Sequence, residues 1–506
     1  MSETIQIRTG EESLDPQSWE EMRALGHRMV DDVLGWMASH RERPAWRPVP
    51  EEVEARFRGP LPREPQGAEA AYRDFQRDVL PYPVGNVHPR FWGWVAGTGT
   101  PLGALGDFLA ASLNSSAAGF DDASGRVESQ VLDWLREMLG FPAATSGLLT
   151  SGCSMAQVIG LAVARHVKAG FDVGRRGLVA AERPPALYAS SQTHSSVKRA
   201  VELLGLGRES LRLLPVGADH RLDLGALRAA VAADRRAGFQ PLCAIGNAGT
   251  VNAGATDDLE GLAEICAAED LWLHVDGAFG ALAWLCPELR PQLAGLQRAD
   301  SLAFDLHKWM YLPFEVGCIF TRSEAEQFAT FQVDSEYLQP AARGTRSGRT
   351  RWHSDYGPQL TRGFRALKVW LSLKEHGVDR YARIIRQNVE QARYLARRVE
   401  AEPRLELVGP VPLNVVCFRY RRSGLDLEQL NALNAELLAD LQEGGRAVVS
   451  HTVLDGRFVL RAAITNHRSR RDDFDVLVDE VLRLGEAASA PRASESEPRE
   501  IKEACP

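Results

Sequence analysis

Short apolar runs alternate with helical stretches through the middle of the chain. The apolar runs are Gly177–Ala181, Ala186–Ala189, Leu242–Gly246, Leu271–Val275, Ser301–Phe304 and Val316–Thr321. The helical stretches are residues 154–168, 195–204, 224–235 and 258–269. Strands that are apolar throughout are typical of a parallel sheet, because helices bury both of its faces. The pattern therefore predicts an α/β fold with a mostly parallel sheet, and ligands bind such sheets at the carboxyl ends of the strands.

Other patterns flank this region. Residues 19–37 repeat Met, Leu, Val and Trp at three- and four-residue steps, which predicts an amphipathic helix whose apolar stripe needs a cover. Further helices are predicted at 51–57, 102–113, 126–139, 364–400 and 472–484, and further strands at 413–420, 446–451 and 457–464. We predict an N-terminal helical, dimer-forming segment (1–87), a large domain (88–385), a smaller C-terminal α+β domain (386–486) and a disordered tail (487–506).

Composition excludes several classes of partner. A net charge of -8 argues against nucleic acid, which needs a basic face to bind phosphates. The N-terminus is acidic and polar, unlike a signal peptide, and no apolar run reaches the ~18 residues of a membrane span. The seven cysteines are scattered without CxxC spacing, so we predict reduced thiols in a cytoplasmic protein and no metal site.

One lysine follows a predicted buried strand. The segment Ser301–Trp309 reads S-L-A-F-D-L-H-K-W and places Lys308 after the apolar run and a bend. Burial disfavours the ammonium form, so we expect a lowered pKa and a nucleophilic amine at Lys308. Taken alone, Lys308 is better explained as an ordinary surface lysine that follows a strand, and the motifs elsewhere in the chain favour the nucleophilic amine.

Three more polar groups stand at predicted strand ends. The turn Thr150–Ala156 opens a helix, whose free N–H groups and Ser154 hydroxyl favour an anion, although Ser154 alone could be a plain N-cap. His194 lies between a strand and a helix, where a capping or core role is the usual one. Asp276 ends a very apolar strand, so its carboxylate needs a cation or strong donors, and a protonated ring nitrogen would satisfy it.

Together these segments resemble a known family. The motifs S-L-A-F-D-L-H-K-W, H-V-D-G-A-F-G, H-P-R-F-W-G, T-R-G-F-R-A-L-K-V-W and L-R-A-A-I-T-N-H occur in the order found in the pyridoxal phosphate-dependent group II amino-acid decarboxylases. The resemblance covers roughly residues 20 to 484. It implies a type I pyridoxal-phosphate (aspartate-aminotransferase-like) fold, a large domain that binds pyridoxal 5'-phosphate, and a homodimer.

The resemblance also implies roles for individual residues. Lys308 would hold the cofactor as a Schiff base, Asp276 would keep the pyridine nitrogen protonated, and His194 would stack on the ring. The remaining predicted cofactor residues are Cys153, Ser154 and His307 at the phosphate, Ala278 under the ring, and Thr250 and Asp305. The predicted substrate pocket contains Phe91, Trp92 and Trp94, and the predicted proton donor, on a lid of residues 338–356, is His353 or Tyr356.

This chain departs from the family pattern at three places. Asp305 stands where many relatives have Asn, and it would repel a phosphate unless it turns away or finds a donor. Ala96 and Gly97 replace a Pro-Thr pair near the substrate carboxylate, so no carboxylate contact is carried over there. In the lid, His353 takes the position of a catalytic tyrosine, and Tyr356 follows three residues later.

The predicted function is decarboxylation of an L-amino acid to the amine and CO2. Phe91, Trp92 and Trp94 favour an aromatic substrate if they line the pocket, and packing in the core is an equally good interpretation of these rings. The altered lid leaves oxidative deamination to an aldehyde, or carbon–carbon lyase chemistry, as alternatives. An acidic substrate is a further alternative, because the lid holds Arg343, Arg346, Arg349 and Arg351. A non-catalytic protein that keeps the fold is disfavoured, since Lys308, Asp276 and His194 are all present.

Overall fold

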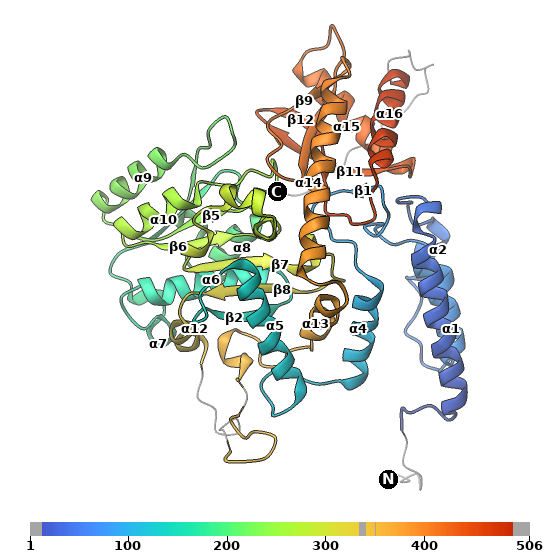
Figure 1. Cartoon of the computed structure of the whole chain (residues 1–506), viewed down its shortest axis with the longest axis horizontal. Helices are drawn as coiled ribbons and strands as arrows, with labels where there is room; N and C mark the ends of the chain where they lie inside the picture. Colours follow the sequence, from blue (N-terminus) through green and yellow to red (C-terminus); the bar gives the residue numbers. More distant parts are fainter. Residues whose placement is uncertain (1–12, 333–340, 350, 489–506) are drawn as a thin grey trace, which may run out of the picture. The chain divides into compact units, whose positions relative to one another are not determined.

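The computed structural model describes residues 13–332, 341–349 and 351–488 (Figure 1). They divide into two compact units, the first formed by the chain up to Arg43 and by Val49–Pro83, and the second by Pro44–Pro48 and the chain from Val84 onwards. The predicted tail from residue 489, Cys505 and lid residues 338–340 and 350 lie outside the described residues. Among the described helices, none is long and apolar enough to cross a membrane.

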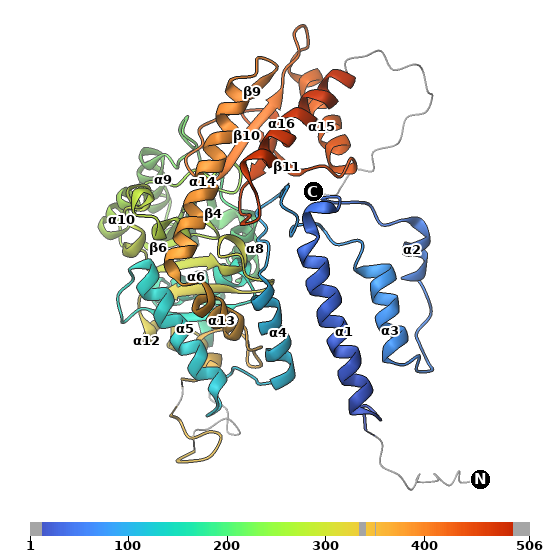
Figure 2. The same ribbon diagram turned by 45° about the vertical axis from the view of Figure 1, so that its right-hand side comes forward.

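The first unit is helical. It contains α1 (Trp19–Ala38), the 3-10 helix η1 (His40–Glu42), α2 (Glu51–Arg56), α3 (Ala68–Asp74) and the π-helical turn η2 (Phe75–Val79). Ser18 caps α1 by accepting from the N–H of Glu21, as expected for an N-cap serine. Polar contacts join α1 to α3, which lie side by side (Figure 2), and the Tyr72 hydroxyl donates to Asp32 at 2.8 Å.

The larger sheet of the second unit has seven strands in the order β2-β8-β7-β6-β5-β3-β4. Their bounds are β2 Ser146–Thr150, β3 Pro185–Ser190, β4 Leu211–Leu214, β5 Gln240–Asn247, β6 Trp272–Asp276, β7 Ser301–Asp305 and β8 Gly317–Thr321. β8 runs antiparallel to both of its neighbours, and the five strands from β7 to β4 are parallel to one another. The predicted mostly parallel sheet is therefore confirmed.

Helices cover both faces of this sheet. They are α4 (Pro101–Leu113), α5 (Ala123–Leu139), α6 (Cys153–Lys168), α7 (Val173–Arg176), α8 (Ser195–Leu203), α9 (Leu224–Arg236), α10 (Leu259–Ala268), α11 (Leu306–Trp309), α12 (Glu324–Phe331) and α13 (Ala366–His376). The 3-10 helices are η3 (Leu178–Ala180), η4 (Arg208–Ser210), η5 (Gly280–Leu285), η6 (Pro287–Leu293), η7 (Leu296–Arg298) and η9 (His353–Tyr356). α6 and α8 share one apolar core with the sheet, whereas α5, α9, α10 and η5 belong to another.

The smaller sheet has five strands in the order β1-β11-β12-β10-β9. They are β1 (Phe91–Trp92), β9 (Leu405–Leu407), β10 (Val415–Tyr420), β11 (Val448–Leu454) and β12 (Arg457–Ala463), with α15 (Leu427–Glu443) and α16 (Arg471–Ala487) packed on them. α14 (Val378–Glu400) contributes to two cores: Ile385 and Val389 belong to the core of the larger sheet, and Leu395 and Val399 to that of the smaller one.

Most predicted elements are confirmed, and the exceptions have physical reasons. The run Gly177–Ala181 is not a strand, because it forms the turn η3 with Val179 fully at the surface. The single helix predicted over 364–400 is two helices, broken at Gly377, whose φ of +68° favours glycine. Among the strands and helices that were not predicted are β1, β2, β4, β9, α3, α7, α12 and α15. The domain boundaries stay a prediction, and the one after residue 385 falls inside α14.

Candidate active site

Lys308 lies at the carboxyl end of β7, in the short helix α11. Leu306 and Trp309 are fully buried and fix this turn in the core. The Lys308 amine reaches 2.9 Å from the Asp305 carboxylate. Burial lowers the pKa of Lys308, but Asp305, Cys153 and Asp276 outweigh it, so that the pKa is raised. The predicted lowering of the pKa is therefore wrong, because the Asp305 carboxylate, three residues earlier, pairs with the amine.

Asp305 finds two donors. Its Oδ1 accepts from the Cys153 N–H at 2.6 Å, and its Oδ2 faces Lys308. The carboxylate is only 2% exposed, as expected for a charged group that is fully paired. Of the two arrangements considered from the sequence, Asp305 adopts the one in which it finds donors. It thereby takes the first free N–H of α6, a donor expected to serve the phosphate.

Asp276 lies at the end of β6, the strand next to β7. Its Oδ1 accepts from the Ala278 N–H at 3.1 Å and lies 3.7 Å from the Cys153 sulfur. Burial raises the pKa of Asp276, while Lys308, the Ala278 N–H and His194 oppose that rise. A carboxylate that is penalised by burial and open to a cavity suits a cationic ring nitrogen, which agrees with the predicted role.

His194 both caps a helix and faces the cavity. As the N-cap of α8, its Nδ1 accepts from the Ser196 N–H at 3.2 Å. Burial lowers the pKa of His194, which favours the neutral ring with its proton on Nε2. The capping role and the predicted site role therefore coexist in one side chain.

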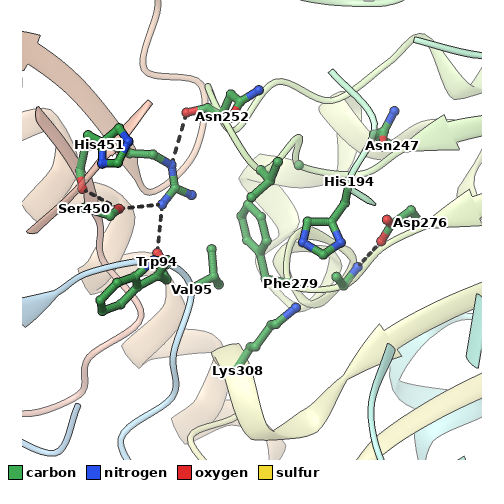
Figure 3. Close-up of a pocket in the computed structure, with 14 residues that line it drawn as sticks. Trp94, Val95, His194, Asn247, Asn252, Asp276, Phe279, Lys308, Ser450 and His451 are labelled. Atoms are coloured by element: carbon green, nitrogen blue, oxygen red, sulfur yellow. Dashed lines mark hydrogen bonds between the residues drawn. The ribbon is translucent and has the colours of Figure 1, made fainter. Parts of the chain in front are cut away.

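Two cavities meet at His194, Ala278 and Lys308, which line both. One, of about 620 Å³, is also lined by Cys153, Ser154, Asp305 and His307, the residues predicted to lie at the phosphate. The other, of about 260 Å³, is also lined by Asp276, Trp94, Val95, Asn252, Phe279 and Arg461. Figure 3 shows Lys308 directed towards His194 and Phe279 in this second cavity. The site can thus hold a phosphorylated ring beside a second small molecule.

Three residues predicted in the site lie outside both cavities. Trp92 stacks on Phe474 with ring centroids 4.6 Å apart, and Phe91 packs against Val448. Both belong to the core because β1 joins the smaller sheet beside β11. Thr250 is 1% exposed, and its hydroxyl accepts from the Ala255 N–H inside a turn. Trp94, with 57% of its surface exposed, is the predicted aromatic that does line the cavity.

The predicted proton donors also lie elsewhere in this chain. His353 is fully buried near Glu128 and Arg362, which form a buried ion pair at 2.6 Å, and burial lowers the pKa of His353 to about 4. The Tyr356 hydroxyl donates to Glu324 at 2.9 Å. Neither side chain lines the cavities, because η9 packs against α12 rather than over the strand ends.

Two arginines of the lid have acidic partners outside the cavities. Arg349 pairs with Asp121 at 2.7 Å, and Arg351 lies 3.5 Å from Glu324 and over the Tyr356 ring. Neither lines the site, so these two give no support to an acidic substrate.

Gly97 shows why the carboxylate contact of relatives cannot be carried over. A Cβ at this position would lie 1.9 Å from the backbone oxygen of His307, so only glycine fits this close approach. No side chain can therefore extend from position 97 towards a substrate.

Arg461, on β12, is a site residue that sequence reasoning missed. Its side chain is 3% exposed and donates to the backbone oxygens of Trp94 and Asn252 and to the Ser450 hydroxyl. Its Nη2 has no hydrogen-bond partner among the described residues, and no carboxylate forms an ion pair with it there. Burial lowers the pKa of Arg461 to about 10. An arginine inside the apolar strand Phe458–Ala463 was the available signal.

Comparisons with known proteins agree with this geometry. Residues 50–421 match the model of the pyridoxal-dependent decarboxylase conserved domain. The chain belongs to the pyridoxal-dependent decarboxylase family. It is 33% identical to an aromatic-L-amino-acid decarboxylase of Bacillus atrophaeus, over 97% of this chain and 98% of that protein. It is 30% identical to a phenylacetaldehyde synthase of Petunia hybrida, over 89% of this chain and 91% of that protein.

A solved structure gives the same result for the fold. The crystal structure of Oryza sativa TDC with PLP and tryptamine superposes with a TM-score of 0.87 at 27% identity, over 94% of this chain and 99% of that one. The decarboxylase described here therefore has the type I pyridoxal-phosphate fold and uses pyridoxal phosphate. The buried Asp276, the amine of Lys308 and the α6 start fit that cofactor.

The pairing of Asp305 with Lys308 gives a prediction. Because the carboxylate raises the pKa of Lys308, Asp305→Asn should lower it and increase the free amine at neutral pH. Capture of pyridoxal phosphate by the apo-enzyme, followed by its visible absorbance, should then shift to lower pH by about one unit or more. Asp300→Asn is the control, because Asp300 directly precedes the first residue of β7, at the end away from Lys308. This variant should leave the pH dependence of cofactor capture unchanged. An unchanged profile for Asp305→Asn would contradict the role of this ion pair.

Proposed function

We propose that this decarboxylase converts an aromatic L-amino acid to its amine and CO2. The observation that carries the proposal is a single cavity lined by Lys308, Asp276 and the buried cation Arg461. The wall formed by Trp94, Val95 and Phe279 offers an apolar face for a ring. The relatives named as aromatic-L-amino-acid and tryptophan decarboxylases support this substrate class.

Each residue has a role in this proposal. Pyridoxal phosphate, when bound, supplies a protonated ring that accepts the electrons released at the substrate α-carbon. Lys308 anchors the cofactor covalently, Asp276 holds the proton on its ring nitrogen, and His194 covers one face of the ring. Ser154 and His307 bind the phosphate, with Cys153 and Asp305 at the same helix start, and Ala278 packs under the ring.

Arg461 binds the substrate carboxylate in this proposal. A buried guanidinium without an acidic partner is best satisfied by an anion, and an amino acid brings one. Holding the carboxylate fixes the orientation of the bond that breaks. The negative charge disappears as CO2 leaves, so the contact contributes to binding and orientation more than to stabilising the transition state.

One observation favours a second candidate, decarboxylation with oxidative deamination to an aldehyde, in which O2 and water are consumed and CO2, ammonia and hydrogen peroxide are released. Neither His353 nor Tyr356 lines the cavity, so the predicted acid for protonating the α-carbon is not supplied there by the described part of this chain. The Petunia relative is named as an aldehyde synthase. The two candidates share the cofactor and the same first steps.

Measuring the reaction products distinguishes the two candidate functions. With L-tryptophan, L-tyrosine and L-phenylalanine, we expect CO2 and the amine in equal amounts, measured by gas evolution and chromatography. Lys308→Ala should abolish both products and the visible absorbance of the bound cofactor. Aldehyde and ammonia in place of the amine would establish the second candidate, and absence of bound cofactor in the wild type would refute both.

The role of Arg461 gives another prediction. Arg461→Met should raise KM for the amino acid by about tenfold or more, because a charge pair buried in a binding site is lost, and change kcat less. Inhibition by the product amine, which has no carboxylate, should be unchanged. Arg457→Met, on the same strand but exposed and paired with Glu406, is the matched control. Equal weakening of amino acid and amine would mean that Arg461 only supports the fold.

We also propose a homodimer. In the first unit, α1 buries Leu25 alone and leaves Trp19, Met22, Met29, Val30 and Leu34 exposed. A second copy of the chain is the natural cover for such a stripe.

This dimer can be tested on α1. Replacing Met29 and Leu34 together by glutamate should yield a monomer in sedimentation analysis, because two charges would enter the apolar contact. Arg23→Gln, an exposed change on the same helix, should stay dimeric. A double variant that remains dimeric would place the interface elsewhere.

The proposed location is the cytoplasm. Six cysteines, Cys153 and Cys417 among them, are free and buried, which suits a reducing compartment. Fractionation of the source cells would test this.

A further inference from the structure

A row of buried polar side chains ends at Asp276. Its members, in order, are Trp272, Ser301, His274, Gln157, Cys153 and Asp276, and each is at most 6% exposed. The indole of Trp272 donates to Ser301 Oγ at 2.8 Å, and Ser301 Oγ lies 2.7 Å from His274 Nδ1. His274 Nε2 lies 2.5 Å from Gln157 Oε1, and Gln157 Nε2 lies 3.5 Å from the Cys153 sulfur. The sulfur in turn lies 3.7 Å from Asp276 Oδ1.

The groups at the two ends of the row determine which way its hydrogen bonds run. The Trp272 indole N–H can only donate, and at the other end the Cys153 thiol donates to Asp276 Oδ1, so the donors point from Trp272 towards Asp276. Burial raises the pKa of Cys153 well above its usual range, which keeps the thiol protonated and able to donate to Asp276. The sulfur then accepts from Gln157 Nε2, which leaves Gln157 Oε1 to accept from His274.

His274 is consistent with this direction. Burial lowers its pKa to about 3, so the ring is neutral and carries a single proton. Ser301, which already accepts from Trp272, donates to Nδ1, and the proton of the ring lies on Nε2 and faces Gln157. Every hydrogen bond in the row therefore polarises the next in the same sense.

The carboxylate at the end of the row has few other donors. Lys308, His194 and the Ala278 N–H favour its ionised form, whereas burial and the nearby Asp305 oppose it. Lys308 is paired with Asp305 and becomes the covalent anchor in the proposed function, so its charge is not reserved for Asp276. A donor fixed behind the carboxylate compensates for part of the burial penalty.

We infer that Cys153 and Gln157 are positioning residues that keep the Asp276 carboxylate ionised and directed at the ring nitrogen of pyridoxal phosphate. This inference rests on the proposed role of Asp276. A purely structural row would satisfy buried polar groups equally well, but it would affect all ligands of the site alike.

The test compares two cofactors on the apo-enzyme. Pyridoxal phosphate and its 1-deaza analogue, in which carbon replaces the ring nitrogen, are titrated by fluorescence into the wild type, Cys153→Ala and Gln157→Leu. Each variant should bind pyridoxal phosphate about fivefold more weakly, as for loss of a modest hydrogen bond, and bind the deaza analogue as the wild type does. The double variant should be little worse than either single one, because both act through one row.

Controls keep the test decisive. Val163→Ala, in the core on the same helix, weakens packing without touching the row and should leave both affinities unchanged. If Gln157→Leu does not fold, Cys153→Ala still carries the comparison. The inference is overturned if Cys153→Ala and Gln157→Leu weaken the binding of both cofactors equally, or weaken the binding of neither. If the wild type binds pyridoxal phosphate and the deaza analogue equally, the proposed role of Asp276 is overturned as well. If the wild type prefers pyridoxal phosphate and the variants prefer it just as strongly, only the role of Cys153 and Gln157 is overturned.

Discussion

The site depends on how two buried carboxylates are balanced at the ends of neighbouring strands. Asp276 and Asp305 end β6 and β7, which are adjacent in the larger sheet, and both lie almost wholly out of water. Isolated charges in such a place would be strongly unfavourable, so each carboxylate needs cations and N–H donors within reach. Lys308, the start of α6 and the Ala278 N–H supply them. The same demand makes the end of the sheet receptive to a cationic ring.

The sequence was most informative about residues whose role follows from their place at the end of a strand. Apolar runs predicted β3, β5, β6 and β7, and the polar residues after β6 and β7 predicted Asp276 and Lys308 at one edge of the sheet, since parallel strands bring their carboxyl ends together. The start of α6 was predicted from its small-residue turn, although the strand before it was not. The pairing of Asp305 with Lys308 was less accessible. It reverses the expected pKa shift of the lysine, and it depends on which rotamer places the carboxylate beside the amine.

Residues whose role depends on contacts between distant segments could not be predicted in this way. Phe91 and Trp92 looked like pocket aromatics, but β1 pairs with β11, more than 350 positions later, and takes both into a core. His353 was placed by aligned position alone, whereas the structure buries it near the Glu128–Arg362 pair. Arg461 went unnoticed because its one local signal, a charged residue among apolar neighbours on β12, does not say which cavity the side chain faces.

Because α14 packs in the cores of both sheets, it bears on any attempt to change the substrate that the cavity accepts. Lys308 and Asp276 come from the larger sheet and Arg461 from the smaller one, and both sheets pack on the same 23-residue rod. The distance between the Lys308 amine and the Arg461 guanidinium therefore depends in part on how the two sheets pack along α14, in addition to the hydrogen bond from Arg461 to the Asn252 oxygen. Redesign for a longer or shorter substrate would therefore involve residues of α14 that line neither cavity, as well as residues of the cavity wall.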